Sequence, residues 1–498
     1  MSVEFEKITP GKLSNAAIIP QVLDHQWVPE SLLEIMIRDG KSLERKEIQR
    51  ERSKHVIKEW RRALIYGEQV IVNRTFLFNN EIIVDDYDDA ENREQLKNLL
   101  NNKVIIPYFV SEDAPDERPD FDMKESQWNA WMDIVRESHM SCVRLDWGNQ
   151  NSAFKALSGA FHNYVQTLNT EQRAEHLAGY LKIPKNEFPE FRKRLKDVAV
   201  FAFNMADTRL ATRDDVYKEF VVIDGTNLVE GHYSKKPYAS KIKQIVDLKY
   251  NVILSDAMGR YSLTPQGSPP RSALGDLEDI LQANVISAQN VNDILHALRS
   301  LAFDQVTQGM YLKSLGDLNL SDVNRTRNTD EWDMYKGAML DLLRNPLQFP
   351  DLSARFYAKF AKLNETITHI RVERDQAKWE PWVKLLISVG SKAIEIAINP
   401  ADPSQKLLTT LGAGVLSTGV TPFLMRLAIG AKTFTDADLD VSLDFMRGNV
   451  STGRDVWNEM IGQLRSTPGF KELVNEIDIE REANQSQPEN LSLNYYGY

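Results

Sequence analysis

The sequence predicts an α+β protein that is predominantly helical, with an N-terminal α/β module and an all-α C-terminal domain. Two observations predict this fold class. Between residues 69 and 145, short runs rich in β-branched residues alternate with helical segments of about ten residues or more, as in βαβ units. From residue 272 onward, apolar residues recur at helical spacing instead. We therefore expect a small, largely parallel sheet in the first half of the chain and helices alone in the second.

The sequence predicts a chain of four parts. We predict an N-terminal arm at 1–40, the α/β module at 41–265, the helical domain at 272–483 and a flexible C-terminal tail at 484–498. The arm is expected to be irregular because three prolines interrupt its short apolar pieces. Gly267, Pro269 and Pro270 mark the boundary between the module and the helical domain.

Composition restricts the classes of function. The 498 residues carry a net charge of -11, which argues against general binding to nucleic acid or to anionic membranes. A single cysteine, Cys142, excludes an intramolecular disulfide and any cysteine-rich metal site. The first 20 residues include early acidic residues and no apolar core of signal-peptide length, so we predict a cytoplasmic protein.

Individual elements follow from these patterns. Within the module we expect helices at 41–66, 91–100, 124–138, 151–167, 170–181 and 186–207, and strands at 69–73, 104–110, 141–145 and 220–224. The stretch 242–254 is ambiguous. In the second half we expect helices at 273–281, 290–308, 330–343, 352–375, 379–398, 407–425, 436–447 and 452–464, with Asp330, Asp436 and Thr452 as N-caps.

The most apolar part of the chain is the stretch 379–432, and within it 407–425 has no charged residue. Gly412, Gly414 and Gly419 give this segment a surface that another helix can approach closely. A membrane span needs about 20 predominantly apolar residues, and this run only just reaches that length. We expect a helix in the core of the helical domain. A latent membrane-inserting hairpin and a subunit interface are the alternatives.

The predicted strands also locate a ligand site. In parallel sheets, ligands gather beyond the carboxyl ends of the strands. Residues following the first three predicted strands are Asn73 and Arg74, Glu112 and Asp113, and Asp146, Trp147 and Asn149. Arg144 and Asp146 alternate to the same face of their strand, which favours either a structural ion pair or a polar ligand contact. We predict Asn73, Arg74, Arg144 and Asp146 as ligand-binding residues.

A second candidate site is Asp224, at the end of the apolar run 220–224 and followed by Gly225, Thr226 and Asn227. A carboxylate fixed at a strand end, beside hydroxyl and amide oxygens, is how many phosphodiesterases hold Mg²⁺. The stretch resembles the first strand of NYN/PIN-like ribonucleases. That resemblance implies Asp224 as a catalytic metal ligand.

The predicted metal site needs further carboxylates, because one carboxylate cannot hold the ion. Asp247 and Asp256 are the nearby candidates, and we name Asp256 as the second catalytic residue. Thr226 and Asn227 are predicted to bind ligand. The cofactor would be Mg²⁺ for a nuclease, and no other cofactor is predicted. In the competing interpretation, Asp224 caps a turn through its own side chain.

Other polar patterns have simpler interpretations. His139 and Cys142 are spaced like a nucleophile pair, but we interpret Cys142 as a buried, inert thiol. The acidic residues Asp85, Asp86, Asp88 and Asp89 lack the central glycine of a calcium loop, and we expect a solvated loop there. None of the eight histidines has metal-ligand spacing such as HxxxH.

Three functions fit the sequence. The first is a sensor or effector protein, as in bacterial stress or antiviral defence, in which the α/β module controls a helical domain with a latent apolar hairpin. The second is a Mg²⁺-dependent nuclease or phosphodiesterase centred on Asp224, and the third is a non-catalytic oligomeric scaffold. We expect a protein partner or self-association. Nucleic acid is not favoured, and a membrane would be met only after a conformational change.

Overall fold

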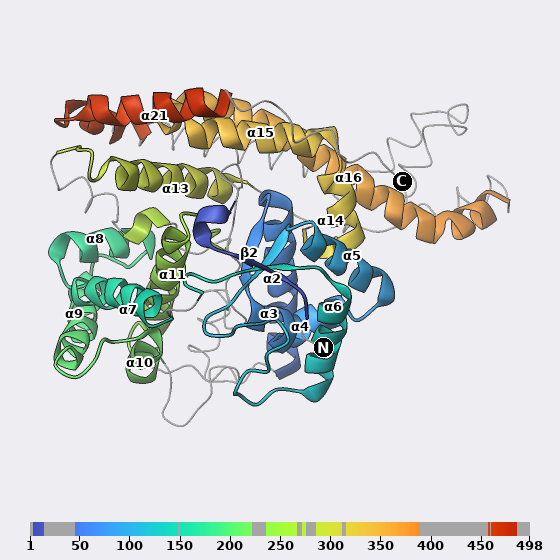
Figure 1. Ribbon diagram of the computed structural model, residues 1–498, viewed down its shortest axis with the longest axis horizontal. Helices are drawn as coiled ribbons and strands as arrows, with labels where there is room; N and C mark the ends of the chain where they lie inside the picture. Colours follow the sequence, from blue (N-terminus) through green and yellow to red (C-terminus); the bar gives the residue numbers. More distant parts are fainter. Residues whose placement is uncertain are drawn as a thin grey trace.

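The computed structural model describes residues 3–13, 45–147, 150–221, 236–265, 271–274, 285–310, 315–388, 457–458 and 460–485. The predicted fold class is confirmed: a four-stranded parallel sheet lies in the N-terminal part of a mostly helical chain (Figure 1). The strands are β1 (Glu6–Ile8), β2 (Val70–Asn73), β3 (Ile105–Tyr108) and β4 (Ser141–Val143). Their order across the sheet is β1-β4-β3-β2.

Three of these strands lie where the sequence predicts them. The sequence misses β1, which spans only three residues of the expected irregular arm and pairs with β4 in parallel. The predicted strand at 220–224 is wrong for the two of its residues that the structure describes. Phe220 and Val221 belong to the π-helix η2 (Tyr217–Val221). A capping box between Thr212 and Asp215 starts α10 (Arg213–Val216), and η2 continues from it. Helical neighbours bury Phe220 and Val221, and a short apolar run cannot by itself distinguish this burial from that of a strand.

Helices fill the rest of the described N-terminal half. They are α2 (Arg45–Tyr66), α3 (Arg74–Asn79), α4 (Glu81–Asp86), α5 (Ala90–Asn101), α6 (Glu125–Glu137), α7 (Gln150–Gln166), α8 (Glu171–Tyr180), α9 (Phe188–Met205) and α11 (Ala239–Ala257). The ambiguous stretch 242–254 is therefore helical. The acidic segment 85–89 is a solvated loop only in part. Asp85 and Asp86 belong to α4, where Asp86 pairs with Arg61, whereas Asp88 and Asp89 are exposed in the turn before α5.

The two faces of the sheet pack against different helices. One face presents Ile71, Ile106 and Val143 to Leu254 of α11 and to Met258, which directly follows that helix. The other face contributes Val70, Val72, Ile105 and Cys142 to the largest buried cluster, together with residues of α2, α5 and α6. This alternation follows from the two-residue period of a strand. The sheet is thus covered on both sides.

The described elements of the second half of the chain are all helical. They are η4 (Arg271–Leu274), α13 (Val291–Gly309), η5 (Leu315–Asp317), α14 (Leu320–Arg327), α15 (Asp330–Arg344), η6 (Pro346–Gln348), α16 (Phe349–Ser388) and α21 (Phe470–Gln485). Thr329 rather than Asp330 caps α15, because its side chain accepts the Trp332 N–H. The helix α16 extends past its predicted end and includes 379–388. The predicted helices 407–425 and 436–447 lie outside the described residues.

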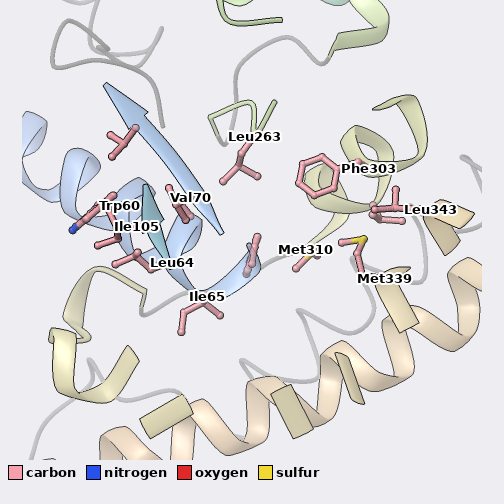
Figure 2. Close-up of a cluster of buried hydrophobic side chains, with 14 of the residues drawn as sticks. Trp60, Leu64, Ile65, Val70, Ile105, Leu263, Phe303, Met310, Met339 and Leu343 are labelled. Atoms are coloured by element: carbon pink, nitrogen blue, oxygen red, sulfur yellow. The ribbon is translucent and has the colours of Figure 1, made fainter. Parts of the chain in front are cut away.

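One core joins the sheet to the rear helices. The largest cluster combines Trp60, Leu64 and Val70 with Phe303 and Met339 of α13 and α15 (Figure 2). A smaller cluster, drawn from residues 161–274, fills the space among α7 to α11. No described helix is both long and apolar enough to cross a membrane.

Polar contacts reinforce the junction between α2 and the rear helices. Arg327 donates to the main-chain carbonyls of Leu64, Gly67 and Glu68 at 2.6 to 2.7 Å. The Tyr335 hydroxyl donates to Tyr66 O at 2.9 Å. Because these acceptors are main-chain atoms, the contacts fix where the backbone lies between α2 and β2.

A buried carboxylate lies nearby on α13. Asp304 accepts hydrogen bonds from the Thr264 hydroxyl at 2.9 Å and from the Arg271 main-chain N–H at 2.8 Å. Burial raises the pKa of Asp304 to about 6, although both hydrogen bonds oppose that rise. This side chain ties α13 to the segments before and within η4.

Candidate functional site

The connections that follow β3 and β4 leave the sheet on opposite faces. After β3 the chain enters α6, whose Trp131, Ile134 and Val135 belong to the largest cluster. After β4 it enters α7, which packs against α11, and Leu157 of α7 contacts the cluster on the other face. Where successive connections diverge in this way, the carboxyl ends of the strands form the usual ligand position of a parallel sheet. The candidate site therefore lies at the ends of β3 and β4.

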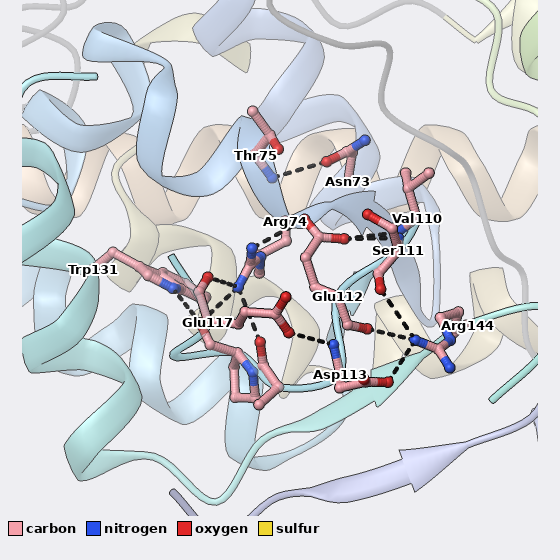
Figure 3. A network of polar contacts seen from close by, with 12 residues as sticks. Asn73, Arg74, Thr75, Val110, Ser111, Glu112, Asp113, Glu117, Trp131 and Arg144 are labelled. Atoms are coloured by element: carbon pink, nitrogen blue, oxygen red, sulfur yellow. Dashed lines mark hydrogen bonds and ion pairs between the residues drawn. The ribbon is translucent and has the colours of Figure 1, made fainter. Parts of the chain in front are cut away.

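Arg74, directly after β2, organises one side of this edge. It is 0% exposed. Its Nη1 donates to the carbonyls of Ala114, Pro115 and Glu117 at 2.8 to 3.1 Å, and its Nη2 donates to Glu112 at 3.0 Å (Figure 3). The guanidinium also lies over the rings of Phe78 and Phe109. Main-chain acceptors dominate, so Arg74 holds the loop after β3 in one shape.

Arg144, directly after β4, holds the same loop from the other side. It is 3% exposed. Its Nη1 donates to Glu112 O and to the Asp113 carboxylate, both at 2.8 Å, and its Nε donates to Asp146 O at 2.8 Å. The Trp147 ring stacks on the guanidinium at 4.7 Å. We call Arg74, Glu112, Asp113, Glu117 and Arg144 the edge network.

Glu112 lies between the two arginines and is held by both charge and main chain. Its Oε2 accepts the N–H groups of Val110 and Ser111 at 3.1 and 3.0 Å. Burial by itself would raise the pKa of this carboxyl, but the Arg74 charge and the N–H donors lower it below its usual value. Glu112 is therefore an ionised, structural carboxylate.

The loop that this network shapes is acidic and exposed. Between residues 111 and 122 there are six carboxylates and one basic residue, Arg118. Asp113 has a side chain that is 72% exposed, and Phe121 is 42% exposed while its ring stacks on Phe78. Trp131 Nε1 donates to Pro115 O at 3.0 Å, and this hydrogen bond attaches the loop to α6. We call residues 109–124 the edge loop.

The residues that the sequence predicts to bind ligand lie at different places along this edge, and only some of them contact the edge loop. Arg74, which the strand-end rule selects, and Arg144, which is predicted from its alternation with Asp146, meet on the edge loop. Asn73 caps α3 by accepting the Thr75 N–H at 2.8 Å. Asp146 meets Arg144 through its main-chain carbonyl, and the ion pair of Arg144 is formed with Asp113 instead. Whether any of these residues binds ligand stays a prediction.

The predicted metal site is only partly described. Asp224, Thr226, Asn227 and the strand-end residue Asn149 lie outside the described residues. Asp256 forms a bidentate ion pair with Arg271, at 2.7 and 2.8 Å, and a 3.0 Å hydrogen bond with His296 Nε2. Burial opposes ionisation here, yet Arg271 and His296 lower the pKa of Asp256 to about 2.

The Asp256 neighbourhood resembles a nucleophile triad only superficially. Ser300 Oγ lies 3.4 Å from His296 Nε2, the same nitrogen that contacts Asp256. A relay needs the acid and the nucleophile on different ring nitrogens. Cys142 is buried at the centre of the sheet, and burial raises the pKa of its thiol, as expected for an inert cysteine.

Among the described residues, no group of three His, Cys, Asp or Glu side chains is arranged to hold a metal ion. No protein family, no curated protein and no solved structure matches the chain. The functional argument therefore depends on the geometry of the chain itself.

Proposed function

We propose that this protein is a sensor-type binding protein whose α/β module receives a basic protein partner on the edge loop. The observation that carries the proposal is the anchoring of this loop by two buried arginines, Arg74 and Arg144, at the divergence point of the sheet. Most of their acceptors are carbonyls of the loop, so the loop is held in shape before any partner arrives. Preorganisation of this kind reduces the ordering entropy that binding must overcome.

The chemistry of the partner follows from what the loop exposes. The exposed carboxylates of the loop lie on either side of the half-exposed Phe121 in the sequence, and they favour a partner surface with Lys or Arg side chains around an apolar contact. They are Asp113, Glu117, Asp120 and Asp122. Aromatic side chains within a polar rim are typical of interface centres. Opposite charge on the partner would speed association and make it dependent on salt.

The rear helices are the proposed response element. Helix α14 packs against α5 and α2, and α15 shares the largest cluster with the sheet, so a change at the module can reach the rear helices through direct packing. The apolar stretch 379–432, whose first residues continue α16, is the part of the chain proposed to respond. Defence or stress signalling is the setting in which we propose this arrangement operates.

Charge neutralisation of the loop tests the proposal. The loop variant changes three exposed carboxylates and the half-exposed Asp116 to amides: Asp113→Asn, Asp116→Asn, Asp120→Asn and Asp122→Asn. A control variant makes the same change of charge on other elements: Glu91→Gln, Glu175→Gln, Glu190→Gln and Glu472→Gln. Quantitative cross-linking in source cells identifies proteins bound by wild type and control but not by the loop variant.

The affinity of a purified partner for wild type and for both variants then tests whether the edge loop is the binding surface. We expect the loop variant to bind at least tenfold more weakly than wild type, and the control variant to bind equally well. Hydrogen exchange on the wild-type complex should show changed protection in α14 to α16. Equal affinity of the loop variant would remove the edge loop as the binding surface, and unchanged protection in the rear helices would remove the sensor role.

A further inference from the structure

The outer face of α9 carries a surface that complements the edge loop. The residues that α9 buries against its neighbours are Phe191, Leu195, Val198, Ala199 and Ala202. The opposite face of the helix carries exposed residues at spacings of three and four, so they form one row along the helix. They are Lys193, Lys196, Val200 and Phe203, which we call the α9 stripe.

The C-terminal half of the stripe is apolar and open to solvent. Phe203 is 68% exposed and Val200, one helical turn earlier, is 44% exposed. Apolar side chains that lie side by side at the surface and are bordered by charge are typical of sites that bind another protein. This half of the stripe therefore offers an apolar contact to a partner.

The N-terminal half of the stripe is basic. Within the part of the chain that the structure describes, neither Lys193 nor Lys196 forms an ion pair, whereas the two arginines of α9 are each paired with a carboxylate. The two lysine charges are thus available to a partner. Because opposite charges favour association, the surface that fits the stripe is acidic and includes an apolar side chain.

The edge loop has that composition. Its exposed apolar side chains are Val110 and Phe121, and the carboxylates of Asp120 and Asp122 on either side of Phe121 are exposed as well. No described residue forms an ion pair with either carboxylate. The loop therefore presents negative charge beside an aromatic ring, and the stripe presents positive charge beside another.

The two surfaces lie in different parts of the molecule. In Figure 1, α9 lies at the left end, and α7 and α11 separate it from the sheet, whereas the edge loop leads into α6 on the other side of the sheet. A contact between the loop and the stripe therefore joins two chains. Both chains carry a net charge of -11, but at physiological salt charges more than about 8 Å apart are largely screened, so the charges that meet in the contact dominate.

We propose that the α9 stripe of one copy of this chain binds the edge loop of a second copy. This inference rests on the function proposed above and names its partner, because the basic surface that the edge loop receives then belongs to the chain itself. Since the two surfaces differ, the contact is heterologous. Each chain keeps one further loop or stripe free, so chains add head to tail until a ring closes.

Sedimentation velocity of the purified full chain, measured over a range of concentrations, tests this pairing. The loop variant is the one defined above. The α9 variant changes three exposed positions of the stripe to glutamine, a good helix former: Lys193→Gln, Lys196→Gln and Phe203→Gln. A control variant changes two exposed lysines and one exposed apolar residue of the rear helices α16 and α21: Lys362→Gln, Lys471→Gln and Ile479→Gln.

We expect wild type and the control variant to self-associate alike. The loop variant and the α9 variant should each self-associate at least tenfold more weakly, because aromatic and charged groups at the centre of an interface carry much of its binding energy. An equal mixture of these two variants should form dimers with one copy of each and no larger species. The mixture contains one intact loop and one intact stripe per pair, so mixed dimers also show that both variants are folded.

Three results would overturn the inference. Either variant might be replaced by wild type without effect, meaning that it self-associates as strongly as wild type. Two monomeric variants that form no mixed dimer would show that loop and stripe do not bind each other. A wild-type chain that stays monomeric at every concentration would remove self-association alone, since the cross-linking comparison above tests a different basic partner of the loop independently.

Discussion

The edge network and the buried polar residues of α11 differ in how completely their side chains are hydrogen-bonded. We call Lys243, Gln244 and Asp247 the α11 cluster. At the edge, Arg74 and Arg144 are surrounded by loop carbonyls and carboxylates. In the α11 cluster, Gln244 is buried with both amide atoms unpaired. A buried polar group whose partners belong to the chain adds to the stability of the fold, whereas one without partners lowers it. The following predictions test that distinction.

The largest effect is expected from Arg74→Met. The substitution leaves Glu112 buried without its ion pair and three loop carbonyls without a donor. Breaking a buried pair from one side costs about 3 to 5 kcal/mol. Urea unfolding should show a loss of that size. Arg118→Met removes an exposed pair with Glu125 and should leave the unfolding midpoint unchanged. Equal losses of unfolding free energy in both variants would show that the buried pair of Arg74 contributes no more to stability than an exposed pair.

Asp304 is an intermediate case, because its two described hydrogen bonds come from neutral donors. Its pKa is about 6 in the folded chain, above the ordinary value of 3.8, so the folded chain binds this proton more tightly. The resulting stabilisation is complete below about pH 4 and is lost as the pH rises through about 6. The Asp304→Asn variant lacks this titration.

The measurement is the difference in unfolding free energy between wild type and Asp304→Asn at several pH values. We expect wild type to lose roughly 2 to 3 kcal/mol relative to the variant between pH 4 and pH 7. Other titrating groups cancel in the difference. A difference that does not change with pH would mean that Asp304 titrates alike in the folded and unfolded chains.

Gln244→Met should have the opposite sign to Arg74→Met. Methionine has a similar volume and removes an amide that is buried without partners. We expect stabilisation by about 1 kcal/mol, measured by urea unfolding. Destabilisation of the same size would mean that the carboxamide is satisfied in the protein alone, and the contrast between the two regions would disappear.

The smallest effect is expected from Asp113→Asn. Its carboxylate pairs with Arg144 but is largely exposed, and such pairs contribute less than about 0.5 kcal/mol. Arg144 keeps its main-chain acceptors in this variant. Thermal unfolding should therefore be nearly unchanged. A large loss would show that Asp113, rather than the loop carbonyls, fixes Arg144.

The sequence predicts three of the four strands of the sheet. It does not predict the first strand or the helical packing around Phe220 and Val221. Periodicity identifies β2, β3 and β4 because each is an apolar run between helical segments. It misses β1, whose three residues gain their strand conformation only by pairing with β4. It also assigns a strand to 220–224, where helical packing buries Phe220 and Val221.

The candidate site shows the same limit. The strand-end rule finds Arg74, Glu112 and Asp113, because position in a parallel sheet determines which residues share an edge. It cannot show that Arg144 pairs with Asp113 rather than Asp146, since that choice depends on the path of the loop. Gln244 gives no signal in the sequence at all. A glutamine on an amphipathic helix is ordinary, and only its burial without partners distinguishes it.

The pairing of β1 with β4 has a consequence for synthesis of the chain on the ribosome. The strand at 6–8 leaves the ribosome first, yet its partner at 141–143 follows more than a hundred residues later. At translation rates of about 5 to 20 residues per second, the wait lasts roughly 7 to 27 s. Throughout that time β1 is without its sheet neighbour, so the sheet of this protein cannot be completed until β4 has been synthesised.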